Sequence, residues 1–586
     1  MTARIPLFII ALVQKVISAA DMREIDRLTT EQFALPSLLL METAARAAAQ
    51  AIEERLPGGI AGTSILILCG RGNNGGDGAA LARLLSLRGA FVDVVLFGRV
   101  EDTKGDARTN FEIAYRLADG GAVFQPTDQP VVLGLTLNGR SGGHLSFTEC
   151  LNEEDWNQFL YFDFPEAPDV LVDALFGTGL TRPLEGLHAE AVRYVNRARA
   201  MREASGASQP LVVSLDLPSG LNADVSTLIG DAVRAHLTVT FTAPKPANVL
   251  PPASYCNGEL VIADIGSPAK LIDAAPSQLF LTKDQAARQW LRQTRYTPDS
   301  YKNTHGHALL IAGSRRYSGA AVLCGDAAMR AGAGLVTVAT PASAVAPVAA
   351  RLMPEVMTAA LPETSDGAVS EEAIEIVSQL SERAQAVALG PVLSAENEGT
   401  RRLVRAIVEH RMKPMVLDAD ALNALAPWPA ELRGTAELPL ILTPHEGEMR
   451  RLLGGANDEG GLADRVGTAR AFAVKHELIL VLKGSRTLVA ATDGRVFINP
   501  TGNAGLGTAG AGDTLTGIIT GFLAQAYGTL ADQADALLAT LSAVYLGGMA
   551  GDLAARELGM RTMTASDIRR HLGAAICALD VEGERP

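Results

Sequence analysis

The sequence predicts an α/β protein of two domains, each with a doubly wound and largely parallel sheet. Three observations point to this fold class. Short apolar runs alternate with helical segments along most of the chain, which is typical of strand–helix–strand units. The composition favours small aliphatic residues, since 48% of the residues are hydrophobic but only 5% are aromatic. The length of 586 residues is enough for at least two hydrophobic cores.

The first predicted domain spans residues 18–267. It opens with a helical pattern over 22–54 that is interrupted near Pro36, and short apolar runs then predict buried parallel strands. Residues 131–168, with Gly-rich and acidic-aromatic pieces, are interpreted as an insertion, and the loss of periodicity over 266–279 predicts a linker. The strands are expected at 64–69, 91–96, 170–172, 211–215, 237–241 and 260–263.

The second predicted domain spans residues 281–578 and shares the layer type of the first half but none of its motifs. Residues 5–13, ahead of both domains, are apolar but too short to cross a bilayer, and we interpret them as an extra leader rather than a signal peptide. The strands of the second domain are expected at 308–312, 335–339, 386–389, 414–417, 440–443 and 479–482.

Charge and cysteine content exclude several functional classes. A net charge of -14 argues against a protein that binds the phosphate backbone of nucleic acids. The five cysteines include no CxxC pair, so neither a zinc site nor a disulfide framework is indicated. We therefore expect a cytoplasmic protein with no nucleic-acid partner. We further expect that it forms a homo-oligomer and acts on small molecules, with no membrane partner.

Polar residues follow four strands of the first half, at the sheet edge where doubly wound folds bind their ligands. The strand at 64–69 runs into GRGNNGGDG, a glycine-rich turn before a helix, whose Asn and Asp side chains offer oxygen ligands for a hard cation. Each later aspartate alone is compatible with a turn cap, but the four groups together predict a binding site. The polar residues that follow the later strands are Asp173, Asp216 with Ser219, and Lys245.

The run 499–517, NPTGNAGLGTAGAGDTLTG, is the most informative stretch of the second half. Its six glycines allow backbone N–H groups to converge on an anion, and the helix that follows adds the positive end of its dipole. Asp513 beside such an anion hole would repel the ligand unless it acts as a base on a hydroxyl that meets the phosphate there. A second interpretation, that Asp513 only caps the helix, is equally compatible with the residues.

Two other motifs of the second half bear on ligands. The turn KGSRT at 483–487 lies between two expected strands and combines a cation with N–H donors, as a nucleotide-phosphate clamp does. His445 follows the strand at 440–443 in LTPHEGE. It is compatible with a helix cap, but we predict that it lines the substrate pocket.

The motifs METAARA, GRGNNGGDG, VDALFGTGL, SLDLPSGLNAD and TFTAPKP occur in this order over most of residues 18–265 and resemble the NAD(P)H-hydrate epimerase family. The resemblance implies a Rossmann-like, three-layer domain that interconverts the R and S forms of hydrated NADH and NADPH at C6. It implies that Asp216 is the acid/base and that a potassium ion binds at Asn74, Asp173 and Ser219. The implied substrate contacts are Asn73, Asn74, Gly75, Gly76, Asp77, Gly177, Thr178, Gly179, Leu180, Thr181, Arg182, Pro183 and Asp216.

The motifs of roughly residues 281–575 resemble the ADP- or ATP-dependent NAD(P)H-hydrate dehydratases, a branch of the ribokinase-like superfamily. The resemblance implies that the S form is dehydrated at the expense of ADP with Mg2+, giving AMP and phosphate, with Asp513 as base on the C6 hydroxyl. The implied nucleotide contacts are Lys483, Gly484, Ser485, Arg486, Thr487 and Gly512, and the implied substrate contacts are Ala320, His445 and Asp513.

The chain departs from the second family at one place. The family has GPGLG where this chain has Gly390-Pro391-Val392-Leu393-Ser394. Because valine is expected to avoid the backbone angles that glycine adopts there, substrate contact at this loop is in doubt.

Two rival functions remain open at this point. The first is a ribokinase-like small-molecule kinase fused to a dinucleotide-binding module, which would release a stable phosphorylated product. The second is a non-catalytic scaffold in the first half, which would not need Asn74, Asp173, Asp216 and Lys245.

Overall fold

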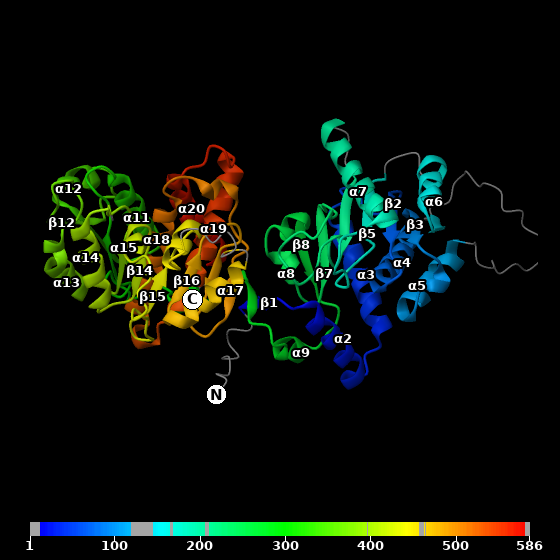
Figure 1. The fold of residues 1–586 in the computed structure, drawn as a ribbon, viewed down its shortest axis with the longest axis horizontal. Helices are drawn as coiled ribbons and strands as arrows, with labels where there is room; N and C mark the ends of the chain where they lie inside the picture. Colours follow the sequence, from blue (N-terminus) through cyan, green and yellow to red (C-terminus); the bar gives the residue numbers. More distant parts are fainter. Residues whose placement is uncertain are drawn as a thin grey trace, which may run out of the picture. The chain divides into compact units, whose positions relative to one another are not determined.

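The structure is a computed structural model that describes residues 12–118, 144–163, 168–205, 210–394, 396–455, 462 and 464–580. The chain divides into two compact units (Figure 1). One consists of Lys15–Ser277, and the other consists of Met1–Gln14 together with Gln278–Pro586. Each unit has its own sheet. The expected leader lies outside the described residues except for its last two positions.

The sheet of the Lys15–Ser277 unit has seven strands, and every pair of neighbours is parallel. Its order is β4-β3-β2-β5-β6-β7-β8, so the chain changes direction across the sheet between β2 and β5. All six strands expected from the sequence are present. The bounds are β2 (Ser64–Cys69), β3 (Phe91–Phe97), β4 (His144–Cys150), β5 (Val170–Ala174), β6 (Leu211–Leu215), β7 (Leu237–Phe241) and β8 (Glu259–Ala263).

The strand β4 corrects the expectation of an insertion over 131–168. It pairs with β3 at the edge of the sheet, and the short helix α6 (Glu153–Gln158) follows it. The sequence HLSFTEC gives little apolar signal because an edge strand is covered less completely than a central one; only two of its seven residues are buried. The rest of the expected insertion, 131–143 and 164–167, lies outside the described residues.

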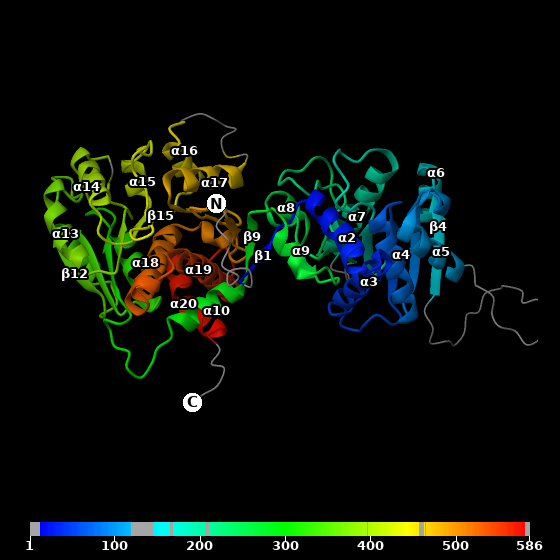
Figure 2. The same cartoon turned by 90° about the horizontal axis from the view of Figure 1, so that it is seen from below.

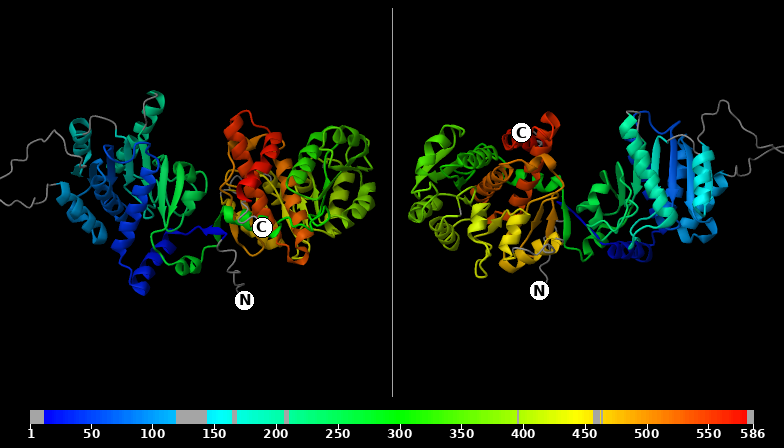
Figure 3. Two further views of the ribbon diagram at one scale, coloured as in Figure 1. Left: turned by 180° about the vertical axis from the view of Figure 1, so that it is seen from behind. Right: turned by 45° about the horizontal axis from the view of Figure 1, so that its top comes forward.

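Helices cover both faces of this sheet. Ile65 and Ile67 of β2 pack in one cluster with α3 (Ser37–Glu53), α4 (Asn73–Leu87) and α5 (Gly105–Ala118). Leu66 and Leu68 point the other way and pack with α6 and α7 (Gly186–Ser205). Alternate side chains of one strand thus feed two cores, which confirms the doubly wound, three-layer prediction (Figure 3).

The N-terminal helical pattern is also confirmed. It forms two helices, α2 (Ala19–Phe33) and α3, on either side of Pro36. Ser18 caps α2, because its hydroxyl accepts a hydrogen bond from the backbone N–H of Asp21. Residues 266–279, expected to be a linker, contain the helix α9 (Ala269–Ala274) and the first residue of a strand, so that prediction is wrong for much of its length.

The other unit contains an eleven-stranded sheet in the order β1-β9-β18-β17-β16-β15-β14-β13-β10-β11-β12. Figure 2 shows β12 and β1 at opposite ends of it. It is parallel from β16 to β12, whereas β17 is antiparallel to both of its neighbours. The six expected strands are again present, within one or two residues. The bounds are β1 (Val13–Lys15), β9 (Leu279–Thr282), β10 (His307–Ile311), β11 (Leu335–Pro341), β12 (Met357–Leu361), β13 (Ala386–Leu389), β14 (Met415–Leu417), β15 (Leu440–Leu442), β16 (Ile479–Leu482), β17 (Leu488–Ala490) and β18 (Val496–Ile498).

Six helices share one hydrophobic cluster with this sheet: α10 (Asp284–Gln293), α11 (Ser318–Arg330), α12 (Ala342–Ala349), α18 (Ala511–Thr529), α19 (Ala536–Leu558) and α20 (Ala565–Leu579). The helix α19 is long and apolar enough to cross a membrane by length and composition, but 67% of its most apolar window is buried inside the structure, as in a core helix. The remaining helices are α8 (Pro246–Val249), α13 (Ile374–Glu382), α14 (Glu398–Glu409), α15 (Asp420–Ala424), α16 (Glu446–Leu452) and α17 (Arg465–His476).

The N-terminal half of α18 packs closely against α11. A methyl carbon added at Gly517 would lie 2.2 Å from the carbonyl oxygen of Cys324 in α11. Only glycine allows the two helices to approach this closely. Gly517 lies one helical turn after Asp513, so this contact with α11 also holds the first turn of α18 in place.

Candidate functional sites

Asn73 to Asp77 form the first turns of α4, with Gly72 as the N-cap residue. The glycine-rich turn predicted from the sequence is thus shorter than expected, and these five residues are helical. Close contact requires the glycines: a methyl carbon at Gly75 would lie 1.8 Å from the carbonyl oxygen of Gly70. The helix therefore begins directly against the end of β2, at the point where the strand order reverses, which is the usual ligand position in such sheets.

Asn74 is buried, with 8% of its surface exposed, and neither polar atom of its side chain has a hydrogen-bond partner within the described structure. Buried amides are nearly always hydrogen-bonded, so this side chain indicates a ligand. A methyl carbon at Gly177 would lie 3.5 Å from Asn74 Cγ and 3.2 Å from Asp216 Oδ2. Three predicted site residues from three different segments thus meet at one place.

Asp216 follows β6 with a φ of 62°, a strained angle for a residue other than glycine. Its Oδ1 accepts a hydrogen bond from Lys245 Nζ at 2.5 Å. The side chain of Lys245 is 1% exposed and that of Asp216 is 14% exposed. The Lys245 ammonium also donates to Thr240 Oγ1 and to the carbonyl oxygen of Phe241. This arrangement presents one carboxylate oxygen of an ion pair to the site.

Asp173 lies at the end of β5 and is fully buried. Its oxygens accept hydrogen bonds from the hydroxyl of Ser219 at 2.5 Å, the hydroxyl of Ser214 at 2.8 Å and the backbone N–H of Ser219 at 2.8 Å. Burial raises the pKa of Asp173, and these hydrogen bonds oppose that rise. The structure therefore brings together two of the three predicted cation ligands and places the third, Asn74, with Gly177 and Asp216.

The loop at 177–183 leaves Gly179, Thr181, Arg182 and Pro183 exposed, whereas Leu180 is buried. Of its residues, Gly177 has the contacts with Asn74 and Asp216 described above. The exposed residues are accessible to a ligand from solvent.

Sequence reasoning missed Asp26 of α2. Burial raises its pKa to about 6, with Asp216 adding to the rise and Lys245 opposing it, and its Oδ1 is a buried atom without a partner in the described structure. Burial also raises the pKa of Asp77 well above its usual range, with Asp216 and Asp26 as further causes. Three carboxylates thus share one lysine. Asp26 ends the segment MREID at 22–26, but only the fold brings α2 to the Lys245 segment.

In the other unit, Asp513 occupies the third position of α18, and Gly510 is the N-cap residue with a φ of 86°. The interpretation of Asp513 as the cap is therefore not what the structure shows. Its carboxylate makes no hydrogen bond with any described residue, and burial raises its pKa to about 6, with Asp418 adding to the rise and Lys483 opposing it. A carboxylate that titrates near neutral pH is suited to act as a base.

Lys483 lies beside the same helix start. A methyl carbon at Gly512 would lie 3.3 Å from Lys483 Nζ and 3.8 Å from Asp418 Oδ2. The Lys483 ammonium donates to Asp418 Oδ1 at 2.7 Å. The predicted nucleotide contacts Lys483 and Gly512 are thus adjacent to Asp513, although 29 residues separate Lys483 from Gly512 in the sequence.

Residues 483–487 form the turn between the antiparallel strands β16 and β17. The backbone conformation is unusual at two of them, since φ is 148° at Gly484 and 54° at Arg486. The carbonyl oxygen of Ser485 accepts from Arg465 Nη1, and Arg486 Nη1 donates to the carbonyl oxygen of Pro500. The turn is therefore held from both sides in one conformation.

His445 is the N-cap residue of α16, and its Nδ1 accepts hydrogen bonds from the backbone N–H groups of Gly447 and Glu448. The cap interpretation therefore holds for Nδ1, while the ring remains 55% exposed and accessible to a ligand. Ala320 is buried in the first turn of α11.

The expectation about Val392 is wrong in one respect. Valine does adopt the left-handed region here, with a φ of 53°, and Ser394 follows with a φ of 65°. The loop therefore keeps the glycine-like path and accepts strain, because neighbouring contacts fix it: Gly390 lies against the carbonyl oxygen of Asp418, and the carbonyl oxygen of Pro391 accepts from Gly313. A β-branched residue at such an angle is a genuine outlier.

We expect Val392→Gly to lower the Michaelis constant for the substrate of this unit, with little change in the maximal rate, because the side chain narrows the loop without entering the reaction. The matched control is Val392→Ala, which removes most of the side chain but keeps the backbone strain. We expect the glycine variant to be more stable than the alanine variant by about 1 kcal/mol in chemical denaturation. Equal stability of the two variants would contradict strain at this position.

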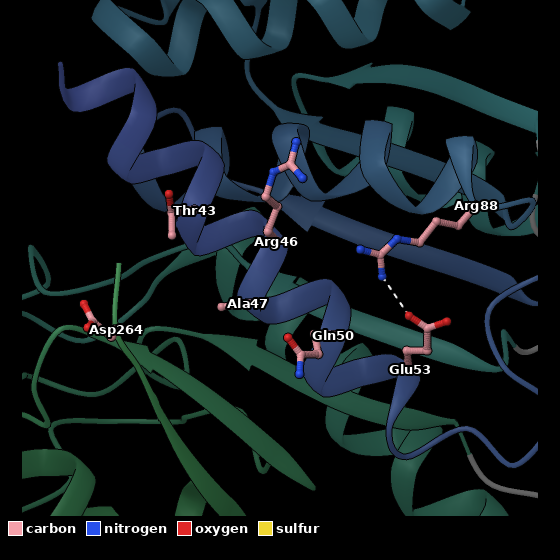
Figure 4. Close-up of a pocket in the computed structure, with 7 residues that line it drawn as sticks. All are labelled: Thr43, Arg46, Ala47, Gln50, Glu53, Arg88 and Asp264. Carbon is pink, nitrogen blue, oxygen red and sulfur yellow. Dashed lines mark hydrogen bonds and ion pairs between the residues drawn. The ribbon is translucent and has the colours of Figure 1, made fainter. Parts of the chain in front are cut away.

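A hollow of about 530 Å³ on the outer side of α3 is not part of these sites (Figure 4). Two of its charged residues already pair with each other, Arg88 with Glu53 at 2.9 Å, and Arg46 pairs with Glu42 at 3.2 Å. None of the predicted site residues lines it, since the lining consists of Thr43, Arg46, Ala47, Gln50, Glu53, Arg88 and Asp264.

Comparison with known proteins agrees with this division into two sites. Residues 308–573 match the family model described as NAD(P)H-hydrate dehydratase, and residues 37–247 match the model described as YjeF-related protein N-terminus. A bifunctional NAD(P)H-hydrate repair enzyme of Moorella thermoacetica is 40% identical over 570 residues, covering 97% of this chain and 98% of that protein. The chain belongs to the bifunctional NAD(P)H-hydrate repair enzyme family.

Two further relatives illustrate the extent of the similarity. The enzyme of the same description from Thermofilum pendens is 36% identical over 96% of this chain and 97% of its own length. A crystal structure of an ADP/ATP-dependent NAD(P)H-hydrate dehydratase from Bacillus subtilis, co-crystallised with ATP/Mg2+, covers 51% of this chain and 97% of its own, with 30% identity and a TM-score of 0.43.

Proposed function

We propose that this member of the repair family restores hydrated NADH and NADPH in two steps carried out by separate sites. Residues 18–267 interconvert the R and S forms at C6, and residues 281–578 dehydrate the S form at the expense of ADP, giving AMP and phosphate. The observation that carries the proposal is Asp513, a partly buried carboxylate without a hydrogen-bond partner in the described structure, beside Lys483 at the glycine-rich start of α18.

The chemistry of the second site follows from these groups. A hydroxyl is a poor leaving group, so the β-phosphoryl group of ADP is transferred to the C6 oxygen, AMP leaves, and Asp513 takes the hydroxyl proton. The N–H groups at the start of α18 and the Lys483 ammonium stabilise the transferred phosphoryl group. Loss of phosphate, with a proton from the neighbouring ring carbon, restores the dihydropyridine. Mg2+ would enter with the nucleotide, since it usually binds through substrate phosphates.

The first site supplies the isomer that the second site accepts. Inversion at C6 requires proton transfer beside the dinucleotide, and we assign this to Asp216, which Lys245 holds in place. We place substrate contacts on Asn73 to Asp77 and on the 177–183 loop. Asn74, Asp173 and Ser219 together offer amide, carboxylate and hydroxyl oxygens, which fit potassium rather than a transition metal. A bound potassium ion would supply positive charge that offsets the ligand's phosphates.

The function is tested by incubating the full chain with a mixture of hydrated NADH epimers, with and without ADP, and following the absorbance of the reduced nicotinamide. We expect complete conversion only with ADP, together with release of AMP and free phosphate. A stable phosphorylated product without NADH would instead identify a small-molecule kinase. If only the S form in the mixture were converted, the first unit would have no epimerase activity.

We expect Asp173→Ala to raise the Michaelis constant of epimerisation more than it lowers the maximal rate. The substitution removes the acceptor of the Ser214 hydroxyl and of the backbone N–H of Ser219, at a cost of about 1–3 kcal/mol in stability. The loop that follows should then lose order. Ser214→Ala is the matched control, because it removes one of these bonds but no predicted cation ligand. Metal analysis that finds a stoichiometric transition metal at the site would contradict the potassium assignment.

A further inference from the structure

Asp418 was not among the residues that the sequence assigned to a site. It directly follows β14 in the segment VLDADAL, and only 1% of its surface is exposed. The backbone turns sharply after it, since Ala419 has a φ of 47° before α15 begins at Asp420. Such backbone strain persists only where surrounding contacts hold it, and it is common at functional sites.

Three donors from three different elements converge on the Asp418 carboxylate. Oδ1 accepts from Lys483 Nζ at 2.7 Å and from Thr443 Oγ1, next to the end of β15, at 2.8 Å. Oδ2 accepts from Thr516 Oγ1 of α18 at 2.9 Å. These partners lie 65, 25 and 98 positions away in the sequence, so the carboxylate joins segments that the chain itself does not connect.

The geometry connects the cation to the base. Thr516 lies three residues after Asp513 on α18, and the added methyl carbon at Gly512 approaches both Lys483 Nζ and Asp418 Oδ2. Asp418 thus holds the Lys483 ammonium with one oxygen and the start of α18 with the other. Its removal would free the phosphate-binding cation to move relative to Asp513.

Electrostatics divides the roles of the two aspartates. Burial alone would raise the pKa of Asp418, but the Lys483 ammonium and the three hydrogen bonds hold it below its usual range. Burial alone would lower the pKa of the Lys483 ammonium. The negative charge of Asp418, with a smaller contribution from Glu448, holds this pKa above its usual range. Asp513, with no such donor, has a pKa of about 6. When the surroundings move the pKa values of two neighbouring carboxylates apart, the two groups are suited to different roles. Here Asp418 is suited to remain charged and Asp513 to exchange a proton.

We infer that Asp418 is a positioning residue of the dehydratase site, whose buried carboxylate fixes the Lys483 ammonium against the first turns of α18 and keeps it beside Asp513. The inference rests on the proposed dehydration by this unit. Asp418 remains ionised and takes no proton from the substrate, while Asp513 is the group that does.

The first test is Asp418→Asn in the full chain, which keeps the size of the side chain but removes the charge. We expect kcat/KM for ADP to fall about a hundredfold, the scale that a displacement of about 1 Å produces in a catalytic constellation. We also expect the acidic limb of the dehydration pH profile to move below about 6. The charged groups that face Asp513 are Asp418, Lys483 and Asp420, and the substitution removes the carboxylate that raises its pKa most.

A second pair of variants decides the matter if the asparagine variant does not fold. Thr516→Val removes the hydrogen bond that the Thr516 hydroxyl of α18 donates to Asp418, without changing any charge. We expect kcat/KM for ADP to fall about tenfold and the pH profile to stay unchanged. Thr520→Val is the matched control on the same helix, because its buried hydroxyl donates only to the carbonyl oxygen of Thr516. We expect wild-type kinetics for the control.

Two results would overturn the inference. The first is that Asp418→Asn folds and keeps the wild-type kcat/KM for ADP and the wild-type acidic limb of the pH profile. The second is that Thr516→Val and Thr520→Val change kcat/KM for ADP by the same factor. Failure of the proposed function is distinguishable, because the wild-type chain would then show no ADP-dependent dehydration at all. Wild-type dehydration with unaffected variants would leave the function intact and remove only the role of Asp418.

Discussion

Asp513→Asn is expected to abolish ADP-dependent dehydration almost completely, with a loss of about a hundredfold or more, the usual scale for a general base. Asparagine has nearly the same shape as aspartate but cannot accept the hydroxyl proton. Because the Asp513 carboxylate makes no hydrogen bond with a described residue, its replacement should leave the fold and nucleotide binding unchanged. Steady-state kinetics with the S form measure the loss, and calorimetric titration with ADP measures the binding.

The pH dependence provides an independent check on Asp513. A base must be deprotonated to act, and burial raises the pKa of Asp513 to about 6. We therefore expect the wild-type rate of dehydration to rise from low pH through about 6 and to reach a plateau above it. Epimerisation by the Asp513→Asn variant, followed by chromatographic separation of the R and S forms, should remain at the wild-type rate. Dehydration near the wild-type rate in this variant would leave Asp513 with no role in the chemistry.

Asp216→Asn is expected to have an equally large effect on the other activity, lowering epimerisation by about a hundredfold or more. In an assay with mixed epimers and ADP, recovery of NADH should stop once the S form is consumed. The R form should then react only at the uncatalysed rate. Dehydration of pure S form should be unchanged, so that this variant and Asp513→Asn serve as reciprocal controls.

The Asp216→Asn variant should also lose stability, because it strands the Lys245 ammonium, which is 1% exposed. Removing one partner of a buried ion pair typically costs about 3–5 kcal/mol. The double variant Asp216→Asn, Lys245→Met removes both charges and should recover much of that stability in chemical denaturation. Activity should not return with it. Recovery of epimerisation in the double variant would mean that the ion pair has a structural role alone.

Local signals were sufficient for most of the architecture. All twelve expected strands are present, because buried parallel strands are continuous apolar runs that can be recognised from neighbouring residues. The break at Pro36 and the helix starts within GRGNNGGD and GTAGAGD are also local, since they depend on glycine and proline. The edge strand β4 and the strands β1, β9, β12 and β18 were missed, because three- to seven-residue edge or peripheral strands carry too little apolar pattern. The strand β17 was expected only as the second strand beside the 483–487 turn, without bounds.

The sequence by itself determined the family, the two-domain α/β architecture and the aspartates that end strands or begin helices, because each depends on short segments and their order. Only the tertiary structure decided which of these groups meet. It paired Asp216 with Lys245, placed Asn74 without a hydrogen-bond partner among the described residues beside Asp216, and joined Lys483 to Thr516 of α18 through Asp418. Such contacts depend on strand order and helix packing between residues up to 98 positions apart, and no local pattern records them.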